Sequence, residues 1–180
     1  MDKGRAYLSH IVIFCYDFPK MLDFYQNKLG LQLSDIGKAR GNDICFLTFD
    51  PDVDHHQIAL ASGRTGPAEG GALNHVAFRV STLKELRRRH DQLKAAGVTG
   101  IETISHVSWF SVYYRDPENN RLEFFWDTPY YVQQPIVEGL DLSRSDEEIM
   151  TDVIARYGKD PSFKPMEDWK RAAVHARPSS

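Results

Sequence analysis

Two histidines and one glutamate occupy positions that could bind a metal ion. His10 and His75 each lie near the start of a strand-like run, and Glu123 is the charged residue within the apolar run LEFFW. Two imidazoles and one carboxylate, with the other coordination positions open, form the facial ligand set that suits non-heme Fe(II). The sequence therefore predicts an iron site, provided that the fold brings these three side chains together.

Each of the three residues also has an ordinary structural explanation. A histidine in a strand is often a hydrogen-bonded core residue, and Glu123 could turn to solvent on an edge strand. A carboxylate buried without a counter-charge costs several kcal/mol, which a divalent metal would offset. A buried Glu123 would therefore favour the metal site.

An internal repeat supports a shared site, because His10 and His75 are 65 residues apart and each begins a similar series of elements. The first copy has predicted strands at 7–15, 31–37, 44–49 and 55–61, with a helix at 18–30. The second copy has predicted strands at 74–80, 98–106, 109–115 and 122–126, with a helix at 82–97. We therefore expect an α+β fold in which two βαβββ modules form a cupped mixed sheet around the metal site.

The ends of several elements carry signals of their own. Asp17 and Thr82 are suited to cap the two helices, and Glu85 follows Thr82 at the spacing of a capping box. The run DPENN at residues 116–120 predicts a tight turn that joins the last two strands into a hairpin.

The composition changes after Pro129, which divides the chain into a domain at residues 1–128 and an extension at residues 129–180. A helix is predicted at Asp146–Tyr157, capped by Ser143 or Ser145. A helix with apolar and acidic residues needs a surface to pack on. The extension is therefore expected to lie on the domain, over the mouth of the site or against a partner subunit.

The composition argues against several functions. The 180 residues carry a net charge of −3, which gives no reason to expect nucleic acid as a partner. No apolar run approaches the ~20 residues that span a membrane, and no signal peptide opens the chain. Cys15 and Cys45 lie in apolar runs and are expected to be buried free thiols, which predicts a reducing compartment and a cytoplasmic protein.

Three stretches resemble the vicinal oxygen chelate superfamily and, within it, the type I extradiol catechol dioxygenases. They are HHQIAL at 55–60, LNH at 73–75 and YYRDPENNRLE at 113–123. The last is the most specific, with an aromatic strand, Asp-Pro, a turn ending in Asn, and then Glu. The resemblance covers about residues 7–126, and it is to the single-domain forms because this chain has one pair of modules.

The resemblance implies a role for each site residue. His10, His75 and Glu123 would hold Fe(II), with Mn(II) as another metal of the scaffold. His56 would handle protons during the reaction, and Tyr113 and His106 would hydrogen-bond substrate oxygens, although the spacing of His106 to Glu123 differs from the pattern by about two residues. Within the predicted strand, His55 should face away from His56 because adjacent strand residues point to opposite faces.

The implied activity is cleavage of a catechol ring beside its two hydroxyls, with O2 as co-substrate. Aromatic residues and the extension favour a substituted or bicyclic catechol, such as a dihydroxybiphenyl, as in the catabolism of aromatic hydrocarbons. A homo-oligomer is expected.

Three other functions use the same scaffold. They are a Mn(II)-dependent thiol transferase of the fosfomycin-resistance kind, a glyoxalase- or epimerase-like metalloenzyme, and a metal-free binding module of the bleomycin-resistance type. The isomerases typically take a carboxylate or amide ligand from the fourth strand, where this chain has His55 and His56. The sequence therefore favours the dioxygenase, and metal content would separate it from the binding module.

Overall fold

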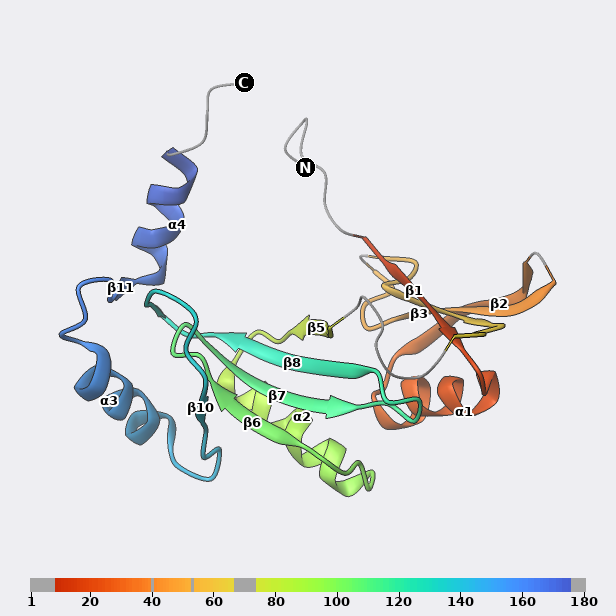
Figure 1. The fold of residues 1–180 in the computed structure, drawn as a ribbon, viewed down its shortest axis with the longest axis horizontal. Helices are drawn as coiled ribbons and strands as arrows, with labels where there is room; N and C mark the ends of the chain where they lie inside the picture. The colour runs from red at the N-terminus through yellow and green to blue at the C-terminus, as the bar shows by residue number, and fades with distance from the viewer. Residues whose placement is uncertain (1–8, 40, 53, 67–73, 176–180) are drawn as a thin grey trace. The chain divides into compact units, whose positions relative to one another are not determined.

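The computed structural model describes residues 9–39, 41–52, 54–66 and 74–175, and its elements follow the predicted repeat (Figure 1). The chain divides into two compact units, one made of residues 1–74 and 116–120, the other of residues 75–115 and 121–180. The first contains β1 (Ile11–Cys15), α1 (Phe18–Asp23), the π-helical turn η1 (Phe24–Lys28), β2 (Gln32–Ala39), β3 (Asn42–Thr48) and β4 (Ile58–Ser62). The second begins with β5 (Val76–Arg79), α2 (Leu83–Ala95), β6 (Glu102–Ser105), β7 (Trp109–Arg115) and β8 (Arg121–Asp127).

Both units have the same strand order. The first sheet runs β1-β4-β3-β2, with β1 parallel to β4 and the other pairs antiparallel. The second runs β5-β8-β7-β6, again with the first strand parallel to the last, and β10 (Glu138–Gly139) adds a fifth strand beside β6. The predicted α+β architecture of two βαβββ modules, each with a mixed sheet, is confirmed.

The helix of the first unit is less regular than predicted. Asp17 caps it as expected, accepting a hydrogen bond from the Lys20 backbone N–H at 3.0 Å, but the α-helical part ends at Asp23 and a π-helical turn follows. Gly30 then takes a φ of 81°, a left-handed conformation that glycine adopts without steric cost. The predicted stop at Gly30 is confirmed.

The turn between β7 and β8 belongs to the first unit and is built around Asp116. The buried Asp116 carboxylate accepts hydrogen bonds from the backbone N–H groups of Glu118 and Asn120, both at 2.9 Å, and from the Tyr25 hydroxyl at 3.1 Å. Burial raises the pKa of Asp116. The predicted hairpin is confirmed, and the aspartate in its DPENN run satisfies the turn's own donors.

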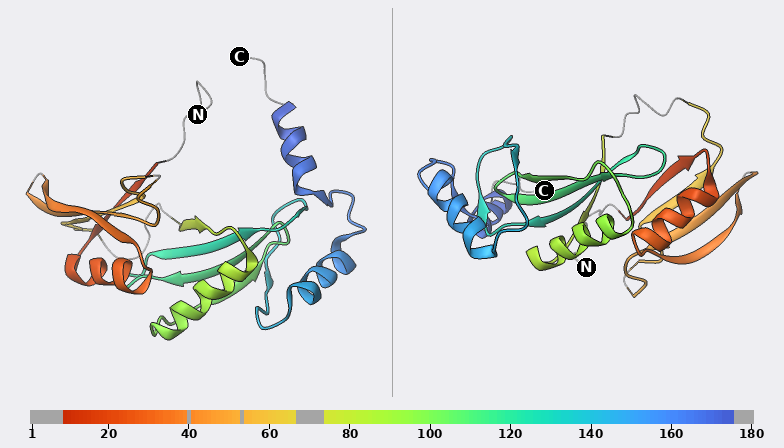
Figure 2. Two further views of the ribbon diagram at one scale, coloured as in Figure 1. Left: turned by 180° about the vertical axis from the view of Figure 1, so that it is seen from behind. Right: turned by 90° about the horizontal axis from the view of Figure 1, so that it is seen from below.

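The second sheet packs one face against α2, which lies along it in Figure 2. Leu86 and Leu93 of α2 are fully buried, as are Phe110 and Leu122 on the strands. Thr82 caps α2 by accepting from the Glu85 N–H at 3.1 Å. The Glu85 carboxylate pairs with Arg88 at 2.6 Å and Arg89 at 3.0 Å.

The extension folds within the second unit. It contains β9 (Tyr130–Tyr131), β10, α3 (Asp146–Tyr157), β11 (Lys164–Pro165) and α4 (Met166–His175), and α3 has the predicted bounds. Ser145 caps α3 in a complete capping box, which decides between the two predicted serines. Val132, Ile149 and Val153 are buried, so the extension adds to the core of its unit.

Several predicted bounds are wrong. β4 begins at Ile58, so the segment that holds His55 and His56 precedes the strand. β1 and β5 begin one residue after His10 and His75, and β6 is shorter than residues 98–106. α4 falls in a segment for which the sequence predicts no element.

Cys15 and Cys45 are buried free thiols, as predicted. In the part of the chain that the structure describes, no helix has the length and apolar character that crossing a membrane requires.

Candidate functional site

A cavity of about 800 Å³ lies in the second unit and contains four of the predicted site residues. Alternate residues of three neighbouring strands line it, which places them on the sheet face opposite α2. They are His75, Ala77 and Arg79 at β5, Glu123, Phe125 and Asp127 on β8, and Trp109 and Tyr113 on β7. The period of two along each strand thus gathers imidazole, carboxylate, phenol and guanidinium groups in one space.

His75 and Glu123 form the centre of this arrangement. Nε2 of His75 lies 3.1 Å from Oε2 of Glu123, and the carboxylate is buried, with 4% of the residue exposed. The Ser111 hydroxyl donates a hydrogen bond to Oε1 of Glu123 at 2.5 Å. The alternative of a solvent-facing Glu123 on an edge strand is wrong, because β8 lies between β5 and β7.

Tyr113 and His106 form a second polar pair in the cavity. Nε2 of His106 lies 3.2 Å from the Tyr113 hydroxyl, and its Nδ1 lies 2.5 Å from the backbone oxygen of Ile136. A carbonyl oxygen can only accept, so Nδ1 carries the hydrogen, and in the neutral ring Nε2 accepts from Tyr113. Burial, followed by the nearby Glu123 carboxylate, raises the pKa of Tyr113, which keeps the phenol protonated.

The extension supplies one wall of the cavity. Tyr131 of β9 and Trp169 of α4 both line it, and their rings stack with centroids 5.1 Å apart. Gln134 donates from Nε2 to the backbone oxygen of His106 at 2.8 Å, which fixes the segment before β7. The extension therefore shapes the cavity and holds one of its polar residues.

The first unit gathers the other predicted histidines. β1 and β4 are parallel with Ile11 beside Ile58, so the residues before both strands lie together. The ring centroids of His10 and His56 are 4.3 Å apart, and the two Nδ1 atoms of His55 and His56 are 3.0 Å apart. Burial lowers the pKa of His56, and His10 and His55 add to the effect.

His55 and His56 lie outside β4, so the alternation argument that separated them does not apply. Their contacts separate them instead. His56 is half-buried against His10, whereas the exposed His55 ring pairs through Nε2 with Oδ2 of Asp35 at 2.9 Å.

The predicted residues thus form two groups. His75, Glu123, Tyr113 and His106 line one cavity in the second unit, and His10 and His56 are neighbours in the first. Among the described residues, neither unit by itself contains three His, Cys, Asp or Glu side chains placed to hold a metal.

Sequence reasoning missed Ser111, Arg79 and Lys170. Ser111 could have been found by alternation, since it lies two residues from Tyr113 on the same strand face.

The donors in the second unit fit a divalent metal. A buried carboxylate needs a counter-charge, and an imidazole beside it supplies a second donor of the kind that non-heme iron and manganese accept. The Ser111 hydroxyl orients the carboxylate, as outer hydrogen bonds do around metal ligands. A second imidazole would complete the facial set of two histidines and one carboxylate.

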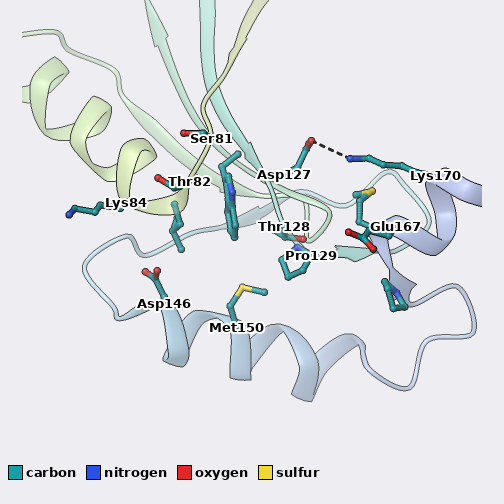
Figure 3. Close-up of a pocket in the computed structure, with 14 residues that line it drawn as sticks. Ser81, Thr82, Lys84, Asp127, Thr128, Pro129, Asp146, Met150, Glu167 and Lys170 are labelled. Carbon is teal, nitrogen blue, oxygen red and sulfur yellow. Dashed lines mark ion pairs between the residues drawn. The ribbon is translucent and has the colours of Figure 1, made fainter. Parts of the chain in front are cut away.

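A second cavity, of about 710 Å³, lies on the α2 side of the same unit (Figure 3). Trp126 lines it, as expected for the residue between Phe125 and Asp127 on β8. Asp127, Met166 and Lys170 line both cavities and form the wall that they share.

Comparison with known proteins agrees with this architecture. Residues 7–124 match the family model described as the Glyoxalase/Bleomycin resistance protein/Dioxygenase superfamily. A domain of that description from Frankia sp. EAN1pec has a similar fold, with a TM-score of 0.59 and 17% identity over 69% of this chain and 100% of that one.

Two relatives from Rhodococcus globerulus are similar in sequence. Biphenyl-2,3-diol 1,2-dioxygenase 2 is 33% identical over 119 residues, which are 64% of this chain and 60% of that protein. Biphenyl-2,3-diol 1,2-dioxygenase 3 is 32% identical over 171 residues, which are 88% of this chain and 78% of that protein. The alignment with the first therefore spans less than two thirds of that relative's length.

Proposed function

The chain belongs to the Glyoxalase/Bleomycin resistance protein/Dioxygenase superfamily, and from that premise we propose that it is an Fe(II)-dependent extradiol dioxygenase. The reaction would add O2 to a catechol and open the ring beside its two hydroxyls. The observation that carries the proposal is the cavity that holds His75, Glu123, Tyr113 and His106 together.

The relatives support the reaction class. Both are named as dioxygenases of biphenyl-2,3-diol, an aromatic ring with two neighbouring hydroxyls. A cavity of about 800 Å³ with aromatic residues on its walls is large enough for a substituted or bicyclic catechol.

We propose that His10 joins His75 and Glu123 as the third protein ligand. Two imidazoles and a carboxylate leave positions open for the substrate and O2. The bound metal would act as a Lewis acid and a template that holds both reactants side by side.

Tyr113 and His106 are proposed to bind and orient the catechol oxygens. The Tyr113 phenol stays protonated because burial raises its pKa, so its single O–H can turn from His106 and donate a hydrogen bond to a catecholate oxygen when substrate binds. Nε2 of His106 accepts from that phenol and can take up or return a proton as the hydrogen bond shifts.

His56 is proposed to exchange protons with the substrate from the His10 side. Its ring contacts His10, so a substrate beside that ligand would be within its reach. An imidazole whose pKa burial lowers is neutral at neutral pH and can therefore accept a proton from a catechol hydroxyl.

The test is O2 uptake by the full chain, loaded with Fe(II) under anaerobic conditions, with catechols that carry no, one-ring or two-ring substituents. We expect stoichiometric iron and one O2 consumed per catechol, with a yellow ring-opened product. His75→Ala and Glu123→Gln should lose both iron and turnover. Tight iron binding without O2 uptake on any catechol would contradict the dioxygenase and favour another reaction of the superfamily, and absence of bound metal would favour a binding module.

A further inference from the structure

The cavity has two chemically different ends. His75, Glu123 and Tyr113 lie at one end, and Arg79, Asp127 and Trp109 lie at the other. Asp127 lies four residue steps after Glu123 on β8, which is roughly 13 Å at the rise of a β-strand. A ligand held at the first end can therefore reach the second only with a substituent that crosses Phe125.

The far end has an excess of positive charge. Asp127 Oδ2 lies 3.3 Å from Nε of Arg79 and 4.0 Å from Nζ of Lys170, and Figure 3 marks its pair with Lys170. One carboxylate thus faces two cations, and all three side chains line the cavity. The cluster has a net charge of +1 and can accept a second anion.

Arg79 is held in place to receive that anion. Its guanidinium lies over the Phe125 ring, 5.0 Å from the centroid, and its ion pair with Asp127 is made through Nε. The two terminal nitrogens of a guanidinium match the two oxygens of a carboxylate. A carboxylate at the end of a substituent that lies along Phe125 would meet this group directly.

We propose that the far end of the cavity selects catechols whose ring substituent ends in a carboxylate, with Arg79 as the main contact and Lys170 as a supporting cation. The inference rests on the proposed function for the diol end only. The apolar stretch formed by Phe125 and Trp109 accommodates the alkyl or aryl part of the substituent.

The test compares each acid with its own primary amide, which has the same length and shape and no charge. Two chain lengths are compared, a dihydroxyphenylpropanoate and a dihydroxyphenylpentanoate. In both, the acid chain is on the ring carbon next to the diol. The iron-loaded protein should favour the pentanoate over its amide by about 5- to 20-fold in kcat/KM, since the contact is charge-assisted but partly open to solvent. The propanoate is too short to cross Phe125 and should show less preference.

Arg79→Gln should remove most of that preference by lowering kcat/KM for the acid and leaving the amide within about twofold. Lys170→Met should remove a smaller part. Arg171→Gln is the matched control, because it is the same arginine-to-glutamine change as Arg79→Gln. Arg171 follows Lys170 in the chain, is exposed, pairs with Asp168 and does not line the cavity. It should leave the preference unchanged.

Equal use of acid and amide by the unmodified protein would overturn the proposal. So would an Arg79→Gln variant that loses acid and amide equally, because that loss would indicate a structural role. If no catechol consumes O2, the proposed function fails, and calorimetric titration with phenylpentanoate and its amide, which carry no diol, still decides this inference. A preference for the acid that Arg79→Gln abolishes supports it, and equal affinities overturn it.

Discussion

The hydroxyl of Tyr113 lies 3.2 Å from Nε2 of His106, and it is the donor in that contact because Nδ1 of the same ring is held by the Ile136 carbonyl. The phenol and the imidazole therefore form one proton path into the cavity. Removing the hydroxyl breaks the path and leaves the edge-to-face contacts of the ring with His75 and His106 in place.

Tyr113→Phe should keep the bound metal and lose about 10- to 100-fold in kcat, toward the lower end of what acid–base groups contribute. Metal content and O2 uptake measure the two effects separately. Tyr114→Phe is the control, since Tyr114 is on the opposite face of β7, stacked on Phe124. A Tyr113→Phe enzyme with normal kcat would remove the phenol from the reaction.

Ser111→Ala should weaken metal binding by about 10- to 100-fold, because the serine hydroxyl orients the Glu123 carboxylate. Competition with a coloured chelator measures the affinity. Ser105→Ala also removes a buried hydroxyl, the one that accepts from the Val107 N–H, and should leave the affinity unchanged. Equal losses in both variants would mean that the Ser111 effect is one of stability.

His56→Ala should retain metal and lose about 10²- to 10⁴-fold in turnover, as expected for a group that moves protons. His55→Ala should cost no more than a few-fold, because the exposed His55 touches His56 but pairs with Asp35. Steady-state kinetics on both variants makes the comparison. If the His55 variant is the inactive one, the proton-transferring role moves to His55.

Burial raises the pKa of Cys15 to about 12 and that of Cys45 to about 11. Both thiols should resist a disulfide reagent at pH 8 in the folded protein and react fully in denaturant. In the unfolded chain a thiol ionises near pH 8.5, so the folded state holds these protons more tightly. Their contribution to the free energy of unfolding is present below that pH and lost as the pH rises toward 12. A variant with alanine at both positions should lose stability less steeply over that range in denaturant titrations.

Truncation after Pro129 should lower the melting temperature sharply, because it removes Val132, Ile149 and Val153 from the core of the second unit. Each buried aliphatic side chain contributes about 1.5 to 3 kcal/mol. Trp169→Ala leaves that core in place and removes only the cavity wall, so it should raise KM for bulky catechols with little change in melting temperature. Unchanged melting and kinetics in the truncated chain would contradict the assigned role of the extension.

Much of the fold could be predicted because its signals are local. β7 has the predicted bounds, and α3 begins after a serine with a glutamate three residues into the helix, which is the capping box that the structure contains. The repeat of strand order also follows from the sequence, since both copies place apolar runs in the same series.

Other features depend on tertiary contacts that no local pattern reports. β4 begins at Ile58 because the ladder with β3 starts there, although the polar residues before it suit a strand. α4 follows β11, which pairs with β9, and its Trp169 stacks on Tyr131, a contact 38 residues distant in the chain. The sequence could not show that Arg79 and Lys170 both face Asp127, because Lys170 lies in α4, whose position no local pattern predicts.

The Ile136 carbonyl, which fixes the hydrogen on His106, comes from the extension and not from the repeated modules. Modules and extension are consequently not interchangeable parts. A chimera that joins these modules to the tail of a relative should still form its sheet. The tautomer of His106 would no longer be fixed in it, unless the new tail places a backbone oxygen beside Nδ1. Changes in the tail that move the Ile136 carbonyl would therefore alter which nitrogen of His106, 30 residues earlier in the chain, carries the hydrogen.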